Sequence, residues 1–195
     1  MQPRMALRFE TLTGDALQPW LFALSRLRLS VFREWPYLYH GDRGAEARYL
    51  RDYARAPGAC VVLALDGSHP VGAATCAPMN GWARAAFNAA GRDPEAYCYF
   101  GESVLLPRYR GQGAGVRFFE LREAQARALG LARATFCGVR RAADDPRRPA
   151  GHVPLDQFWR NRGYAPAGIS GTLRWREVAA RGEQPHVLDF WERLL

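Results

Sequence analysis

The stretch that most limits how this chain can fold is RYRGQGAGVRFFE, residues 108–120, in which Gly111, Gly113 and Gly115 fall close together. An apolar run at 96–107 precedes it, and helical spacing begins near residue 113. Glycine loses more conformational freedom on folding than other residues, so such a cluster usually has a role for the backbone. The pattern predicts a strand that ends in a glycine loop and leads into a helix.

The glycine loop has the properties of an anion site. The first turn of a helix exposes amides without intrahelical acceptors, and the helix dipole adds positive charge there. Residues 114–117 include no acidic side chain, and Arg110 and Arg117 are basic. These features favour a phosphate site made of main chain. The loop lacks the GK[ST] ending of an ATP-binding loop and comes too late for a first-strand dinucleotide motif. A tight strand–helix turn without a ligand stays an alternative.

The remaining segments define the fold class. Strands are predicted at 7–12, 59–67, 69–79, 96–107, 131–139, 168–178 and 186–194, and helices at 15–32, 44–57, 113–129 and 154–162. Residues 80–95 show no clear pattern, and 140–153 form a long polar loop. This order predicts a three-layer α/β fold, with a mixed, mostly antiparallel sheet of about seven strands and helices on both faces. No repeat or linker is visible, so residues 1–195 are predicted to form one domain.

Composition excludes several classes of protein. No run of about 18 apolar residues occurs and the N-terminus lacks a signal-peptide pattern, so we expect no membrane partner and a cytoplasmic location. The four cysteines are Cys60, Cys76, Cys98 and Cys137. They form no CxxC pair and each lies in an apolar run, which indicates buried reduced thiols and no metal site.

The net charge of +8 raises the question of nucleic-acid binding. All 27 basic residues are arginine, and they are scattered along the chain. There is no basic helix and no basic segment interleaved with aromatic residues, so no nucleic-acid partner is predicted. A positive protein does favour anionic ligands, such as a phosphorylated cofactor.

The segment LLPRYRGQGAG and its helix resemble the acyl-CoA motif of the GCN5-related N-acetyltransferase (GNAT) family, written Arg/Gln-x-x-Gly-x-Gly/Ala. Arg110, Gly113 and Gly115 match the motif, and Pro107 lies at the family's usual distance upstream. The segment FWRNRGY, 158–164, resembles the family's helix-to-strand segment. The predicted order of elements is also that of the family, so the resemblance covers nearly the whole chain.

The resemblance implies a V-shaped split between the two central strands, 96–106 and 131–139, with acetyl-CoA bound in it. The pyrophosphate is expected on amides from about Gly111 to Val116. The residues assigned to acyl-CoA binding by the resemblance are Leu105, Leu106, Arg110, Gly111, Gln112, Gly113, Ala114, Gly115, Val116, Phe158 and Trp159. The acceptor amine is expected near residues 32–41 and 78–95.

Acetyl transfer to an amine needs the neutral amine, so the site must supply a base or a water chain. Glu102 is the only carboxylate on the predicted central strand, and it is either this base or a structural carboxylate bonded to an arginine or to backbone. Its strand parity differs from that expected for a base in the family. Tyr99, on the other parity, is a second catalytic candidate or a residue of the substrate wall.

The acid for the leaving thiolate is a departure from the family pattern. Many relatives have tyrosine where this chain has Trp159, and indole cannot act as an acid. Either another residue serves, such as Tyr164, or the thiolate leaves unassisted; Tyr164 is also a candidate for the core. His40, His152 and Asp156 are further polar candidates, and Trp35, Tyr37, Tyr39 and Trp82 could form an aromatic wall around the acceptor.

The sequence therefore predicts an acyltransferase, an acetyl-CoA-dependent N-acetyltransferase. A primary amine of a small molecule or peptide would attack the thioester directly. The alternative is a non-catalytic acyl-CoA-binding or sensing module on the same fold. The last strand, within HVLDFWERLL, could also pair across a homodimer.

Overall fold

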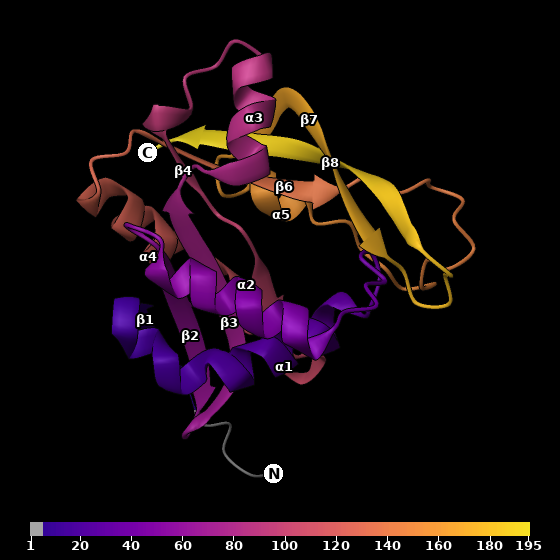
Figure 1. Cartoon of the computed structure of the whole chain (residues 1–195), viewed down its shortest axis with the longest axis horizontal. Coiled ribbons are helices and arrows are strands. Elements are labelled where there is room, and N and C mark those ends of the chain that lie inside the picture. Colours follow the sequence, from indigo (N-terminus) through magenta and orange to yellow (C-terminus); the bar gives the residue numbers. More distant parts are fainter. Residues whose placement is uncertain (1–5) are drawn as a thin grey trace.

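The computed structural model describes residues 6–195, and its elements follow the predicted order (Figure 1). The strands are β1 (Arg8–Thr13), β2 (Cys60–Asp66), β3 (His69–Pro78), β4 (Tyr97–Tyr99), β5 (Ser103–Leu105), β6 (Arg133–Val139), β7 (Ala165–Arg176) and β8 (Glu183–Leu194). The α-helices are α1 (Leu21–Phe32), α2 (Arg43–Arg55), α3 (Gly81–Ala89), α4 (Ala114–Ala128) and α5 (Asp156–Arg160). Short 3₁₀ turns occupy Gly14–Trp20, Pro94–Ala96 and Pro107–Tyr109.

The strands form one mixed sheet in the order β1-β2-β3-β4-β6-β8-β7, and β5 also pairs with β3. Only β4 and β6 are parallel; the other described pairs are antiparallel. The α/β fold with a mostly antiparallel sheet is thus confirmed, with eight strands. No helix within residues 6–195 has the length and apolar character needed to cross a bilayer.

The prediction of one continuous strand over 96–107 is wrong. Relative to β3, the segment makes the pairs Ala77↔Tyr99 and Ala74↔Ser103, so it contains one residue more than its partner. Thr75 fills the gap, since its hydroxyl accepts from the Glu102 amide at 3.1 Å and its amide donates to the Glu102 carbonyl at 3.0 Å. This is a β-bulge, which bends the strand and divides it into β4 and β5.

The bulge opens the predicted V-shaped split. β4 and β6 stay paired as far as Tyr99↔Thr135, and the Phe100 amide donates to the Thr135 carbonyl at 2.8 Å. Beyond that point β5 follows β3, whereas β6 continues along β8 as far as Val139↔Leu188. The two central strands therefore diverge, and their facing edges are left without a neighbouring strand.

Helices cover both faces of the sheet, as predicted. Figure 1 shows α1 and α2 crossing in front of β2 and β3. Their apolar residues, including Leu24 and Leu50, pack on Val61 and Leu63. On the opposite face Phe118 of α4 belongs to a second cluster. α3, within the segment that lacked a clear pattern, packs against β7 and covers the C-terminal half of the sheet.

Candidate functional site

A cleft of about 1260 Å³ occupies the split. One wall is the bulge, Gly101–Ser103, and the facing wall is the end of β6. The glycine loop and α5 close one end, and the other end lies between residues 31–37 and the loop 139–156. The cleft therefore reaches part of the 32–41 segment expected near the acceptor, but no residue of 78–95 lines it.

The glycine loop presents its backbone to the cleft. Gly113 is the N-cap of α4 with φ of +85°, and Gly111 has φ of +70°; both values lie in the left-handed region that favours glycine. Both residues line the cleft. The amides of residues 111–116 donate no hydrogen bond to any acceptor within residues 6–195. These amides lie at a positive helix end without an acidic side chain in the first turn, so they can bind an anion.

Other predicted acyl-CoA residues divide into two groups. Leu105, Val116, Gly115, Phe158 and Trp159 line the cleft together with the loop glycines and Arg110. Leu106 and Ala114 point into the core, and the Gln112 side chain donates to the Arg108 carbonyl at 2.8 Å. None of these three residues lines the cleft.

The Arg110 side chain does not reach over the glycine loop. Its Nε donates to the Leu105 carbonyl at 3.1 Å, and its Nη2 lies 2.9 Å from Glu34 Oε2 at the end of α1. Both members of this ion pair are about half exposed, so the pair is a weak link that a bound anion could replace.

Glu102 lies in the cleft wall, where Arg28 of α1 holds it. Arg28 forms ion pairs with Glu102 and Glu46, and the Tyr49 hydroxyl lies 3.5 Å from Glu102 Oε2. Glu102 Oε1 has no hydrogen-bond partner among the described residues and is not enclosed. The arrangement holds one guanidinium against two nearly buried carboxylates, so it carries a surplus negative charge beside the cleft.

The bulge also changes which face each candidate occupies. Tyr97 and Tyr99 lie on the face covered by α3, opposite α4. Without a bulge, Glu102 would lie on the face of α4, but the extra residue turns it toward α1 and α2. The parity argument against Glu102 therefore does not apply, because the strand is not continuous.

Neither Tyr99 nor Tyr164, the two tyrosines considered as catalytic candidates from the sequence, lies in the cleft wall. The Tyr99 hydroxyl lies 3.3 Å from Cys137 Sγ, its ring packs edge-on against Trp82, and burial raises its pKa well above the ordinary value. The Tyr164 hydroxyl donates to Glu123 at 3.1 Å inside the core, as the core alternative predicted. Trp159 does line the cleft, with ring centroids 5.1 Å from those of both Phe136 and Trp191.

The other polar and aromatic candidates are spread over the structure. His152 and Asp156 line the cleft, and the His152 ring stands edge-on to Trp35 at 6.0 Å. Trp35 and Tyr37 are the two predicted wall residues that reach the cleft. The Tyr39 hydroxyl instead donates to Glu46 at 3.1 Å, and the cleft wall does not include Trp82 or the exposed His40.

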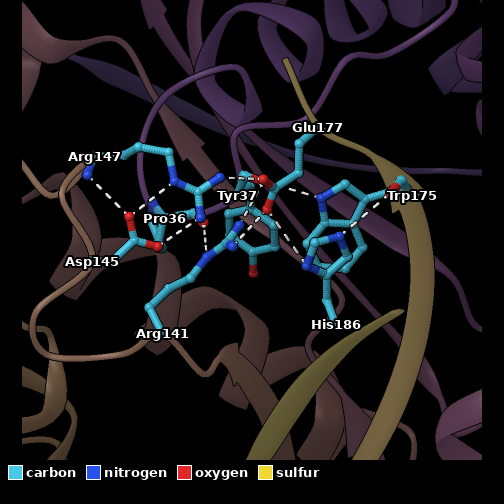
Figure 2. A network of polar contacts seen from close by, with 8 residues as sticks. All are labelled: Pro36, Tyr37, Arg141, Asp145, Arg147, Trp175, Glu177 and His186. Carbon is cyan, nitrogen blue, oxygen red and sulfur yellow. Dashed lines mark hydrogen bonds and ion pairs between the residues drawn. The ribbon is translucent and has the colours of Figure 1, made fainter. Parts of the chain in front are cut away.

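Sequence reasoning missed a charged network around Glu177 (Figure 2). This carboxylate is 4% exposed and lies 2.5 Å from Arg141, in contact with Arg147 and 3.6 Å from His186 Nδ1. Burial alone would raise its pKa, but the hydrogen bonds from the two arginines outweigh burial and lower it. The only sequence signal was a set of arginines in the 140–153 loop, and nothing local links them to residue 177.

The comparisons with known proteins agree with this architecture. The sequence profile described as the Acetyltransferase (GNAT) family matches residues 26–150. A ribosomal-protein-alanine N-acetyltransferase from Brucella melitensis is similar with a TM-score of 0.64 at 17% identity, covering 97% of this chain and 100% of that one. An acetyltransferase from Salmonella typhimurium, solved with its cofactor acetyl-CoA, aligns with a TM-score of 0.59 at 12% identity, covering 96% and 94%.

An aminoglycoside 6'-acetyltransferase of type Ii is also similar, with a TM-score of 0.57 at 18% identity and coverage of 95% and 96%. No curated protein sequence matches the chain. At these identities the structural likeness concerns the fold, and the two acceptors that the names state, a ribosomal-protein alanine and an aminoglycoside, differ from one another.

Proposed function

The chain belongs to the GNAT acetyltransferase family, and we propose that it transfers the acetyl group of acetyl-CoA to a primary amine of a small molecule or peptide. The observation that carries the proposal is the set of free amides at residues 111–116, at one end of an open split. These amides would hold the pyrophosphate. We assign this function to a single domain formed by the whole chain.

The geometry of the split supports binding of an extended acyl-CoA arm. The facing edges of β5 and β6 lack a neighbouring strand, and backbone groups on such an edge accept another extended chain. The two amides of the pantetheine arm are suited to this edge. Phe158 and Trp159 supply apolar surface alongside it. The thioester would then lie near the bulge, beside Glu102.

The electrostatics around Glu102 support an amine as acceptor. The Arg28 cluster has one positive and two negative groups, so an ammonium group that reached Glu102 would find an anionic partner there, although arginines line much of the remaining cleft. Glu102 Oε1 would take the proton, directly or through water, and the neutral amine would attack the thioester carbonyl. The C–N bond forms, the C–S bond breaks, and CoA leaves as the thiolate.

The proposal is tested with acetyl-CoA, a panel of small amines and peptides, and detection of the free thiol. CoA binding is measured separately by calorimetry. Thiol release that depends on an amine supports the enzyme. Binding of CoA without turnover on any amine would favour the acyl-CoA-binding module, and absence of CoA binding would contradict both.

Replacing Glu102 with glutamine is expected to lower kcat/KM by about 100-fold, the usual size of a general-base effect. The pH–rate profile should also change in shape, because the glutamine amide cannot accept the proton that the acceptor ammonium must lose. Arg28 keeps Glu46 as a partner, so folding should be retained. The control is Glu120→Gln on the exposed side of α4, which should leave the profile unchanged. An unaltered profile in Glu102→Gln would exclude the base role.

A further inference from the structure

Tyr37 places a free hydroxyl at the opening of the split. The residue lies between α1 and α2 and lines the cleft together with Glu102 and Cys137. Glu102 and Cys137 follow the last β4–β6 pair and lie on opposite sides of the split. The Tyr37 hydroxyl has no hydrogen-bond partner within residues 6–195 and is not an enclosed atom. Figure 2 shows it directed away from the Glu177 network.

Hydrogen bonds from Arg141 and Trp175 fix the backbone of Tyr37. Its carbonyl accepts from Arg141 Nη2 and from Trp175 Nε1, both at 3.0 Å. The Pro36 carbonyl accepts from Arg141 Nε at 2.6 Å. The Tyr37 ring packs between Phe32 and Trp175, with centroid distances of 4.8 and 5.9 Å. The main chain and the ring are therefore both held while the hydroxyl is left free.

Arg141 is itself held by the buried Glu177 network. Its guanidinium has an exposed side-chain fraction of 12% and pairs with Glu177 at 2.5 Å. Arg147 of the long loop and His186 of β8 contact the same carboxylate (Figure 2). Buried ion pairs contribute little net stability, so this one is better explained by the conformation it specifies. That conformation is the Pro36–Tyr37 turn over the split.

Two other tyrosines of the region are already bonded, outside the cleft wall. Tyr99 is in contact with Cys137 and Tyr164 with Glu123, and neither lines the cleft. Trp159 carries an indole N–H, which is not a suitable proton donor. Burial raises the pKa of Tyr37, and the nearby Cys137 and Glu102 raise it further. Its hydroxyl therefore stays protonated and can act as a hydrogen-bond donor.

We infer that Tyr37 is a catalytic residue whose hydroxyl donates a hydrogen bond to the sulfur of the leaving CoA, with Arg141 and Glu177 as its positioning residues. This inference rests on the proposed function. As the C–S bond breaks, the electron pair passes to sulfur, and the hydrogen bond stabilises the thiolate. Tyr37 keeps its proton, and the thiolate is later protonated by the proton that the amine released.

The test compares CoA with desulfo-CoA, in which hydrogen replaces the thiol group. Calorimetry gives both dissociation constants for the wild type and for Tyr37→Phe. A hydrogen bond to a neutral thiol is weak and one to a thiolate is stronger, so the preference for CoA over desulfo-CoA should be about 3-fold at pH 7 and about 10-fold at pH 9.5. Tyr37→Phe should abolish this preference and its pH dependence.

The matched control is Tyr53→Phe. Tyr53 lies in α2, outside the cleft wall, and its hydroxyl donates to the Cys60 carbonyl. It should keep the wild-type preference. If Tyr37→Phe retains the preference, or weakens CoA and desulfo-CoA equally, the hydroxyl does not contact sulfur and the assignment is wrong. If the wild type binds neither ligand, the proposed function fails first.

The positioning role is tested with Glu177→Gln and with Trp175→Phe, which removes one donor to the Tyr37 carbonyl. Either variant, if folded by circular dichroism, should lose most of the sulfur-specific preference while still binding desulfo-CoA. Adding Tyr37→Phe should then cause no further loss. Additive losses in the double variants would overturn the positioning role.

Discussion

Replacing Gly113 with aspartate is expected to weaken CoA binding by at least about 100-fold. The carboxylate would stand beside the pyrophosphate, and like charges about 4 Å apart near a protein surface repel by several kcal/mol. Gly113 lines the cleft, and a Cβ added there meets no atom within 4 Å. The loss would therefore come from charge and not from a clash. Calorimetric titration with CoA measures it.

Two controls separate charge from backbone strain. Gly113→Asn has nearly the same shape and the same demand for a positive φ, but it has no charge, so it should lose about tenfold less affinity than Gly113→Asp. Gly91→Asp makes the same substitution at φ of +69°, also with open space, outside the cleft. It should bind CoA like the wild type. Equal affinities for the wild type and Gly113→Asp would contradict the phosphate site.

Replacing Arg28 with methionine is expected to lower the free energy of unfolding by about 3–5 kcal/mol, the usual cost of removing one partner from a buried ion pair. The change leaves Glu46, 3% exposed, and Glu102 as neighbouring carboxylates without a cation. Urea unfolding at pH 7 measures the loss. Arg26→Met, on the exposed side of the same helix, is the control and should change stability by less than about 0.5 kcal/mol.

A second substitution identifies the cause of that loss. Adding Glu46→Gln to Arg28→Met removes one of the two carboxylates left without a cation, so it should restore part of the stability at pH 7. A deficit that Glu46→Gln does not reduce would point to lost packing by the Arg28 stem.

Local patterns were enough to predict the glycine loop, the strands β2 and β3, and α4, because the residues that determine them are adjacent in the sequence. The glycines fix left-handed positions at the start of α4, and Gly67–Ser68 makes the two-residue turn between β2 and β3. The V-shaped split was predicted from the resemblance to the family. These features depend on turn chemistry and helical spacing, which a single sequence displays.

The bulge was not predictable, because it depends on contacts from the neighbouring strand β3 and from helix α4, which are distant in the sequence or on another element. Thr75 bonds both backbone groups of Glu102. Arg122, a buried residue of α4, donates to the Glu102 carbonyl at 3.3 Å. The Arg122 guanidinium lies over the rings of Phe100 and Phe119 at 4.4 and 5.0 Å. A buried arginine that interrupted an apolar helix face is therefore part of the support for the bulge.

The Glu177 network escaped sequence analysis for the same reason. Arg141 and Arg147 lie in the 140–153 loop, whereas Glu177 directly follows β7. The His186 ring stacks on Trp175 at 3.7 Å only after β7 and β8 have paired. Each charge looked like an ordinary surface residue in a chain rich in arginine. Only the folded arrangement shows that they enclose a carboxylate and hold Tyr37.

The unpaired edges of β5 and β6 have a consequence for inhibitor chemistry. A compound that imitates a short peptide, with alternating amide donors and acceptors, would complete the sheet by hydrogen-bonding to the unpaired backbone edges of both strands. Such a scaffold needs no adenine or phosphate to gain affinity. Attaching an amine at its end nearest Glu102 would join both halves of the binding site in one molecule.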